Sequence, residues 1–203
     1  MSELRKKQRE KRATAIIKAA MDLITEKGYR NTSIEEIAAK AEVGPATVYN
    51  YFGSKSGLIV SVFSDVKDMM LMKGEKILSN LPDTPEDAVY KLAASYFGNL
   101  SRRFDRKLMR EVYVAIMVEQ LSVRKELMQM DYAVMEHLVK LLEIFQARGQ
   151  LAKDISMVDM AFVLFSIIVT DLTALFMDDD MTTRQFIENM KRHIYLSFRG
   201  FSP

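Results

Sequence analysis

A three-residue link, residues 42–44, lies between two short stretches with helical patterning, and it constrains the fold more than any other feature of the sequence. The first stretch begins after Ser33, which forms a capping-box pattern with Glu36 three residues later. The second begins with Pro45, which lacks a backbone N–H. Proline is favourable there because an N–H in the first turn of a helix has no hydrogen-bond partner within the helix. Two short helices joined by such a turn predict a helix-turn-helix.

Apolar residues recur at helical spacing along the rest of the chain, and no segment shows the strict alternation of a strand. With only 8 Gly and 4 Pro in 203 residues, a turn-rich β architecture is disfavoured. Gly28 is well placed to end the first helix, and Thr84 with Pro85 is a strong helix-start signal. Further helices are expected over 55–79, 85–103, 106–121, 124–148, 157–177 and 183–201. The predicted fold class is all-α, with a three-helix head followed by a larger helical domain.

Composition excludes several kinds of site. There is no Cys, so disulfides and thiolate metal sites are ruled out, and this absence fits a reducing cytoplasm. His137 and His193 are isolated, and no phosphate-cradling glycine loop is present. We therefore do not expect the protein to be an enzyme, and we expect no metal site and no bound cofactor. The most apolar run, 161–176, is short for a bilayer span and carries Asp171, so we expect a cytoplasmic protein with no membrane partner.

Charge is distributed unevenly along the chain. Residues 1–58 hold 11 Lys and Arg against 7 Asp and Glu, whereas the remainder holds 18 against 20. The basic N-terminal arm supplies six of those positive charges: Arg5, Lys6, Lys7, Arg9, Lys11 and Arg12. Such an arm suggests a phosphate-bearing partner, although a solvated tail has the same composition.

The third predicted helix has two distinct faces. Val48 and Phe52 lie one turn apart and should point inward with Val43. The opposite, exposed face should then carry four residues: Pro45, Ala46, Tyr49 and Asn50. Thr47 stands at the third helical position, among backbone N–H groups that have no partner within the helix. The rings of Tyr49 and Tyr51 either face a partner or simply cover a small core.

The stretch from Thr32 to Leu58 resembles the DNA-binding signature of TetR-family transcriptional regulators. The matching residues are Ile37, Ala38, Ala41, Val43, Thr47, Tyr49, Tyr51, Phe52, Ser54, Lys55 and Leu58, all in register. Two positions depart from the usual pattern, because Gly44 replaces a Ser or Thr and Val48 replaces the commoner Leu. Gly44 can still cap the helix, but the missing hydroxyl puts one phosphate contact in doubt.

The resemblance implies that the third helix enters the major groove of double-stranded DNA. Thr47, Tyr49 and Tyr51 would then bind phosphates, with Lys55 adding a charge and Ser33 near the backbone. Such contacts fix the register of a protein on DNA without reading its sequence. The bases would be read by three residues of the exposed face, Pro45 and Ala46 against thymine methyls and Asn50 through a hydrogen bond.

The resemblance also implies a DNA-binding domain over 1–58 and a ligand-binding and dimerisation domain over 59–203. In the family, the last two helices form a dimerising hairpin, and a homodimer binds a palindromic operator, usually as a repressor. The expected dimer stripe is Ile187, Met190, Ile194 and Phe198. Such a stripe, taken alone, would equally well be intramolecular core.

A small apolar or amphipathic effector is expected, because Met is abundant, at 15 residues, and adapts readily to flexible ligands. The candidate pocket residues are Tyr96, Met109, Tyr113, Met117, Met135, Phe162, Ser166 and Thr170. The apolar members would equally well be core, and the hydroxyls would equally well bond their own helix. An alternative for the whole chain is a helical protein-interaction module that keeps the helix-turn-helix only as a scaffold.

Overall fold

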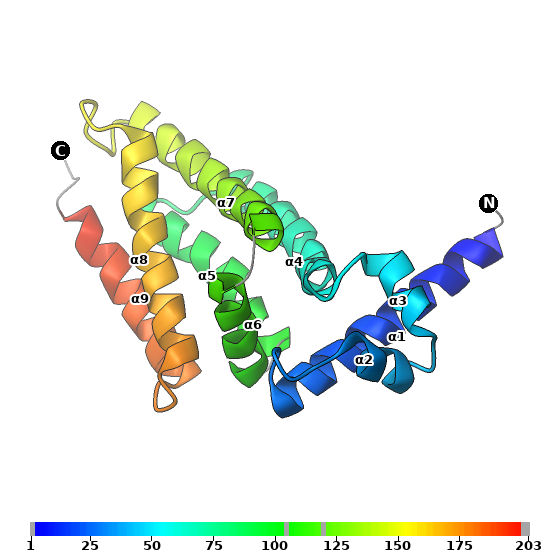
Figure 1. The fold of residues 1–203 in the computed structure, drawn as a ribbon. Helices are drawn as coiled ribbons and strands as arrows, with labels where there is room; N and C mark the ends of the chain where they lie inside the picture. Colours follow the sequence, from blue (N-terminus) through cyan, green and yellow to red (C-terminus); the bar gives the residue numbers. More distant parts are fainter. Residues whose placement is uncertain (1–2, 104–105, 119–120, 200–203) are drawn as a thin grey trace. The chain divides into compact units, whose positions relative to one another are not determined.

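The computed structural model describes residues 3–199 apart from 104–105 and 119–120, and within these ranges it leaves out the side chains of 62–66, 98–103, 114–118, 121–127 and 130. Throughout the described residues the regular structure is helical (Figure 1). The fold-class prediction is therefore confirmed. The chain divides into two compact units, one of residues 1–66 and 104–127 and the other of residues 67–103 and 128–203.

The first unit contains the helix-turn-helix. Helix α1 (Glu3–Lys27) is followed by α2 (Ile34–Lys40) and α3 (Pro45–Phe52), and α2 packs against both of its neighbours. Gly28 ends α1 as predicted, with φ +88° and its N–H bonded to the carbonyl of Ile24. The core of this unit is formed by buried aliphatic side chains, including Ile16, Ala20, Ile24, Ile37, Ala38 and Val48.

Helix α6 (Arg106–Val118) belongs to the same compact unit, far beyond the boundary expected at Leu58. It packs against α1, where the Glu111 carboxylate accepts a hydrogen bond from the Tyr29 backbone N–H at 3.1 Å. These contacts come from a segment some eighty residues along the chain, so local sequence patterns could not reveal them. A division into 1–58 and 59–203 stays a prediction about which parts fold independently.

The second unit is a bundle built from five segments of helix. It takes in the C-terminal parts of α4 (Lys55–Leu78) and α7 (Leu121–Ala147), with α5 (Pro85–Arg103), α8 (Met157–Met177) and α9 (Thr183–Phe198). Helix α9 lies beside α8 and α5 (Figure 1). The predicted start of α5 is confirmed, because the Thr84 hydroxyl accepts a hydrogen bond from the Asp87 N–H. The predicted boundaries of α4, α5 and α8 agree with the structure to within one residue.

Helix α8 has 21 residues and a mean hydropathy of 2.2 in its most apolar window, which is long and apolar enough to cross a membrane. It thus extends further than the apolar run considered from the sequence. Core helices of non-membrane proteins pass the same test. Asp171, in the middle of α8, is buried and bonds to His193 Nδ1 on α9 at 2.9 Å.

The stripe expected to join two copies of the chain is largely internal. Met190, Ile194 and Phe198 are at most 5% exposed, because they form the inner face of α9 against α5 and α8. Their assignment to a dimer interface stays a prediction, and within one chain these side chains already form part of the core. Ile187, which is 36% exposed, lies at the edge of that face and remains accessible. One apolar stripe suits both roles, and only the packing of α5 distinguishes them.

Candidate nucleic-acid interface

The start of α2 is held by a complete capping box. The Glu36 N–H donates to the Ser33 hydroxyl at 3.2 Å, and the Ser33 N–H donates to the Glu36 carboxylate at 2.9 Å. A hydrogen bond from Lys27, joined by those from Ser33, lowers the pKa of Glu36 to about 2. The capping prediction is confirmed. Because the Ser33 hydroxyl also bonds the Glu36 side chain, it is engaged within the protein.

The turn between α2 and α3 depends on an unusual backbone conformation at Glu42. Its φ is +56°, the left-handed region that residues other than Gly seldom adopt. The turn closes with a hydrogen bond of 2.9 Å from the Val43 N–H to the Ala38 carbonyl. Gly44 is the N-cap of α3 in an extended conformation, and Pro45 occupies the first turn as predicted. Gly44 provides no side-chain cap, so its fit here comes from backbone geometry alone.

The two faces of α3 are arranged as the sequence predicts. Val48 is fully buried, and Phe52, one turn further along the helix, is half-buried. Pro45, Ala46, Tyr49 and Asn50 are all exposed, with the Tyr49 side chain 49% accessible. Thr47 is half-buried, and its N–H donates a hydrogen bond of 2.8 Å to the Gly44 carbonyl. The exposed face is therefore small, uncharged and rigidly mounted, with hydrogen-bonding capacity at its edges.

Tyr51 has a less open position than Tyr49. Its ring is half-buried, and it stacks at a tilt against Phe52 with 5.9 Å between the ring centroids. The guanidinium of Arg9 lies over the Tyr51 ring, 5.6 Å from its centroid. The Tyr51 ring thus packs against side chains of the head, and its contact with a partner stays a prediction.

Lys55 is placed differently from its expected role. Its Nζ donates to the carbonyls of Tyr29 and Thr32, at 2.9 and 3.0 Å, and lies 4.1 Å from the centroid of the Tyr29 ring. The ammonium therefore ties the start of α4 to the loop between α1 and α2. A phosphate contact would have to share a group that is already engaged. The sequence pattern identifies the residue, but the loop carbonyls that engage it are set by tertiary structure.

A separate polar cluster lies inside the second unit, around Tyr96 on α5. The Tyr96 hydroxyl and His137 Nδ1 share a hydrogen bond of 2.6 Å, and His137 Nε2 lies 3.3 Å from the Glu75 carboxylate. Burial, with the charge of Glu75 adding to it, raises the pKa of Tyr96 well above its usual range. The sequence offered one unused signal for this cluster, a glycine at position 74 inside α4.

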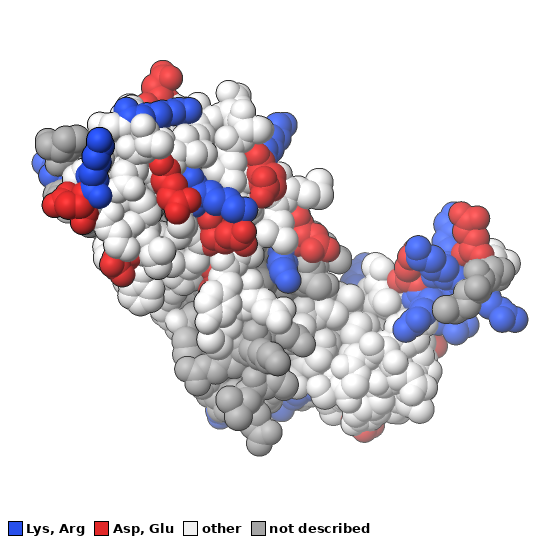
Figure 2. Space-filling view, turned by 90° about the horizontal axis from the view of Figure 1, so that it is seen from above, with Lys and Arg blue, Asp and Glu red and all other residues white. Residues whose placement is uncertain are grey.

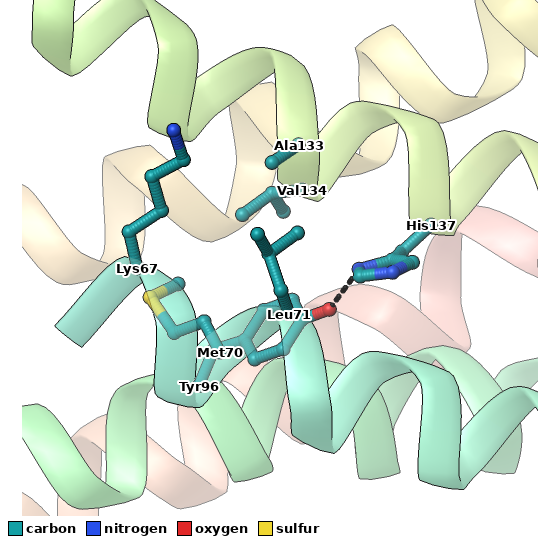
Figure 3. A pocket seen from close by; sticks show the side chains of 7 residues that line it. All are labelled: Lys67, Met70, Leu71, Tyr96, Ala133, Val134 and His137. Atoms are coloured by element: carbon teal, nitrogen blue, oxygen red, sulfur yellow. Dashed lines mark hydrogen bonds between the residues drawn. The ribbon is translucent and has the colours of Figure 1, made fainter. Parts of the chain in front are cut away.

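A small cavity adjoins this cluster (Figure 3). Its volume is about 10 Å³, which holds about one water molecule. The Tyr96 hydroxyl points toward His137, and the Met70 and Leu71 side chains come from α4. The lining residues are Lys67, Met70, Leu71, Tyr96, Ala133, Val134 and His137.

Of the predicted pocket residues, the lining of this cavity includes Tyr96. Met109 is buried and Tyr113 is half-buried, but both belong to the first compact unit. Met135 is half-buried on α7, and the Met117 side chain lies outside the described residues. Phe162, Ser166 and Thr170 lie on the exposed side of α8. The two hydroxyls bond carbonyls four residues earlier in their own helix, which is the alternative that the sequence left open.

No group of three or more potential metal-ligating side chains occurs among the described residues. Both histidines have carboxylate neighbours within their own unit, Glu75 for His137 and Asp171 for His193.

Helix α3 is the exposed, uncharged second helix of a tight helix-turn-helix. This arrangement is typical of helix-turn-helix DNA-binding proteins. The family of bacterial regulatory proteins named for tetR matches residues 16–62, which include the whole motif. Over these residues the head of the chain is similar to the TetR family. The family consists of regulators rather than enzymes, in accord with the expectation from the sequence.

Individual relatives agree with this assignment. The uncharacterised HTH-type transcriptional regulator YvkB of Bacillus subtilis is 47% identical over 49 residues, covering 24% of this chain and 26% of that protein. The fatty acid metabolism regulator protein of Bacillus subtilis is 31% identical over 70 residues, covering 34% of this chain and 36% of that protein. The chain thus spans about a quarter to a third of the curated relatives' length.

Solved structures share the fold across nearly the whole chain. The transcriptional regulator FadR from Bacillus subtilis, in complex with stearoyl-CoA, superposes with a TM-score of 0.77 and 20% sequence identity. The match covers 92% of this chain and 98% of that one. The similarity outside the head is therefore one of architecture.

Proposed function

We propose that this protein is a DNA-binding transcription regulator that acts in the cytoplasm as a homodimer, most simply as a repressor on a palindromic operator. The observation that carries the proposal is the exposed, capped face of α3, on which Pro45, Ala46 and Asn50 are free to meet base edges. The apolar Pro45 and Ala46 suit thymine methyl groups, and the Asn50 amide suits an adenine edge.

Residues around the exposed face of α3 would contact DNA phosphates. Thr47, Tyr49 and Tyr51 place hydroxyls around α3, and Tyr49 carries its hydroxyl on the exposed face. Ser33 and Lys55 have a supporting role in this proposal, because their polar groups already hold the motif together. An uncharged helix can therefore read DNA while its neighbours provide the attraction to phosphate.

The homodimer would form through the outer face of α8. This face exposes the large apolar side chains of Val158, Phe162, Val163 and Met177, and Phe162 is 64% exposed. Exposed large apolar side chains along one helix suit a protein–protein interface. Ser166 and Thr170 lie on the same face with their hydroxyls satisfied internally, so burial against a second copy would leave no unpaired donor.

The second unit would bind a flexible amphipathic effector. The solved FadR structure holds stearoyl-CoA, which makes a long-chain acyl compound a reasonable first candidate here. Tyr96 and His137 offer polar atoms at the edge of the small cavity, and Met70 and Leu71 offer an adaptable apolar wall. A ligand larger than one water molecule must displace these side chains. It would alter DNA binding only through its difference in affinity for the two conformations of the dimer.

The proposal is tested by selecting DNA fragments from a random pool with the purified protein at physiological salt. An enriched palindrome supports a dimeric DNA reader, and its half-site identifies the bases near Pro45, Ala46 and Asn50. The variant Y49F should then bind this DNA more weakly while its thermal unfolding stays unchanged. Failure to enrich any sequence, from a folded dimer, would instead favour the protein-interaction alternative.

A further inference from the structure

The first turns of α1 extend the head with a strongly basic helix. Every side chain from Glu3 to Arg12 is exposed, and the positive charges gather over this end of the molecule (Figure 2). The sequence alone left a disordered tail as an equal possibility. A helix fixes the directions of its side chains, so the arm can be divided into faces.

One face of the arm consists of arginines. Arg5, Arg9 and Arg12 follow the spacing i, i+4, i+7, and the next position in that stripe is Ile16, which is fully buried in the core of the head. The arginines therefore continue, beyond the core, the side of α1 that faces the helix-turn-helix. In the part of the chain that the structure describes, no carboxylate forms an ion pair with any of the three.

Lysines occupy the opposite face. Lys7, Lys11 and Lys18 stand at i, i+4 and i+11, a stripe about half a turn of helix away from the arginines. All three are exposed. The segregation matters because guanidinium groups form paired hydrogen bonds with phosphate, whereas ammonium groups act as hydrated point charges.

Direct contact joins the arginine face to the recognition helix. Arg9 lies over the ring of Tyr51, which is the C-terminal neighbour of Asn50 on α3. A duplex held against α3 therefore has the arginine face beside it rather than the lysine face. The arm from residue 3 to 12 extends about 15 Å, or roughly four base pairs of duplex.

We propose that Arg5, Arg9 and Arg12 bind the sugar–phosphate backbone of the duplex that flanks each half-site. This inference rests on the proposed DNA-binding function and assigns a second nucleic-acid contact to the same head. Arg9 can contact Tyr51 and the DNA at the same time, since its guanidinium plane stacks on the Tyr51 ring while its N–H edge donates to a phosphate. The contact adds affinity and salt dependence without adding base specificity.

The test compares two triple variants of the full chain that lose equal charge from opposite faces, R5Q/R9Q/R12Q and K7Q/K11Q/K18Q. Glutamine preserves helix propensity, and circular dichroism verifies that both variants retain their helix content. Binding is measured as a function of salt on two versions of the selected duplex, one ending at the half-sites and one with additional flanking base pairs on each side.

On the flanked duplex, the arginine triple should lower the salt slope by up to about 2.7 per subunit, at about 0.9 for each phosphate that the protein no longer neutralises. The lysine triple should leave the slope close to that of the unmodified protein. On the trimmed duplex, the unmodified protein and the arginine triple variant should have the same salt slope of binding.

Equal slopes for the two triples on the flanked duplex would overturn the inference, because they would indicate only a diffuse effect of net charge. An unchanged slope for the arginine triple would overturn it as well. Either result leaves the proposed function intact as long as the unmodified protein binds the selected duplex. Failure of the unmodified protein to bind any duplex would reject the proposed function itself.

Discussion

Replacing Gly74 with alanine tests the buried polar cluster of the second unit. Gly74 lies in the interior of α4, where glycine ordinarily weakens a helix. A Cβ atom at this position would fall far inside van der Waals contact with both the Tyr96 hydroxyl and His137 Nδ1. These two atoms are themselves joined by the 2.6 Å hydrogen bond. The glycine is thus explained by the polar groups that fill the space beside it.

Two effects of opposite sign compete in the G74A variant. Helix propensity favours alanine by about 1 kcal/mol. Overpacking costs about 1–3 kcal/mol, and parting Tyr96 from His137 costs about 1–3 kcal/mol more if either buried polar group is left without its partner. The net destabilisation should therefore be about 3 kcal/mol, taking the middle of each range. For a chain of this size, that corresponds to a fall in the unfolding midpoint of about 6–12 °C.

Thermal unfolding followed by circular dichroism measures this change directly. The matched control is the double variant G74A/Y96F, in which one of the two obstructing atoms is absent. Its destabilisation should be smaller than the sum for the two single variants, because the same hydroxyl is removed only once. If G74A raised the unfolding midpoint, helix propensity would outweigh the clash, and the tight cluster around Tyr96 would be refuted.

Three further predictions concern the head. The E36Q variant should be less stable than the parent protein at neutral pH. Because the folded state lowers the pKa of Glu36 from 4.5 to about 2, the stability that the carboxylate contributes should vanish as the pH falls through that window. A difference in unfolding midpoint that stayed constant down to pH 2 would contradict the capping-box argument. The K55M variant should lose about 1–3 kcal/mol of folding free energy, since the Tyr29 and Thr32 carbonyls each lose the hydrogen bond from the ammonium. Unchanged denaturant unfolding would show that the lysine is not needed to hold the loop. Asn50 is exposed, so the N50A variant should unfold like the parent protein. It should instead lose about 1–3 kcal/mol of binding free energy for the selected duplex. Equal binding of N50A and the parent protein in a fluorescence titration would show that Asn50 does not contact the bases.

Local features of the head could be predicted from sequence because their causes are local. The capping box at Ser33, the proline that opens α3 and the glycine that ends α1 each satisfy backbone groups within a few residues. Helical spacing correctly placed Val48 inside and Asn50 outside, since one buried face determines the direction of the other. The left-handed conformation of Glu42 was not foreseen, because no glycine marks it.

The partners of side chains from distant segments were decided only by tertiary structure. Lys55 has the same sequence context whether it meets a phosphate or the loop carbonyls, and Met190 fits a dimer seam as well as an internal core. Helical periodicity states which residues share a face but not which surface will cover that face. The contacts of Tyr96 with His137 and of Arg9 with Tyr51 each join positions about forty residues apart. Such pairings depend on how the helices pack, because each helix alone would satisfy its own backbone equally well in many arrangements.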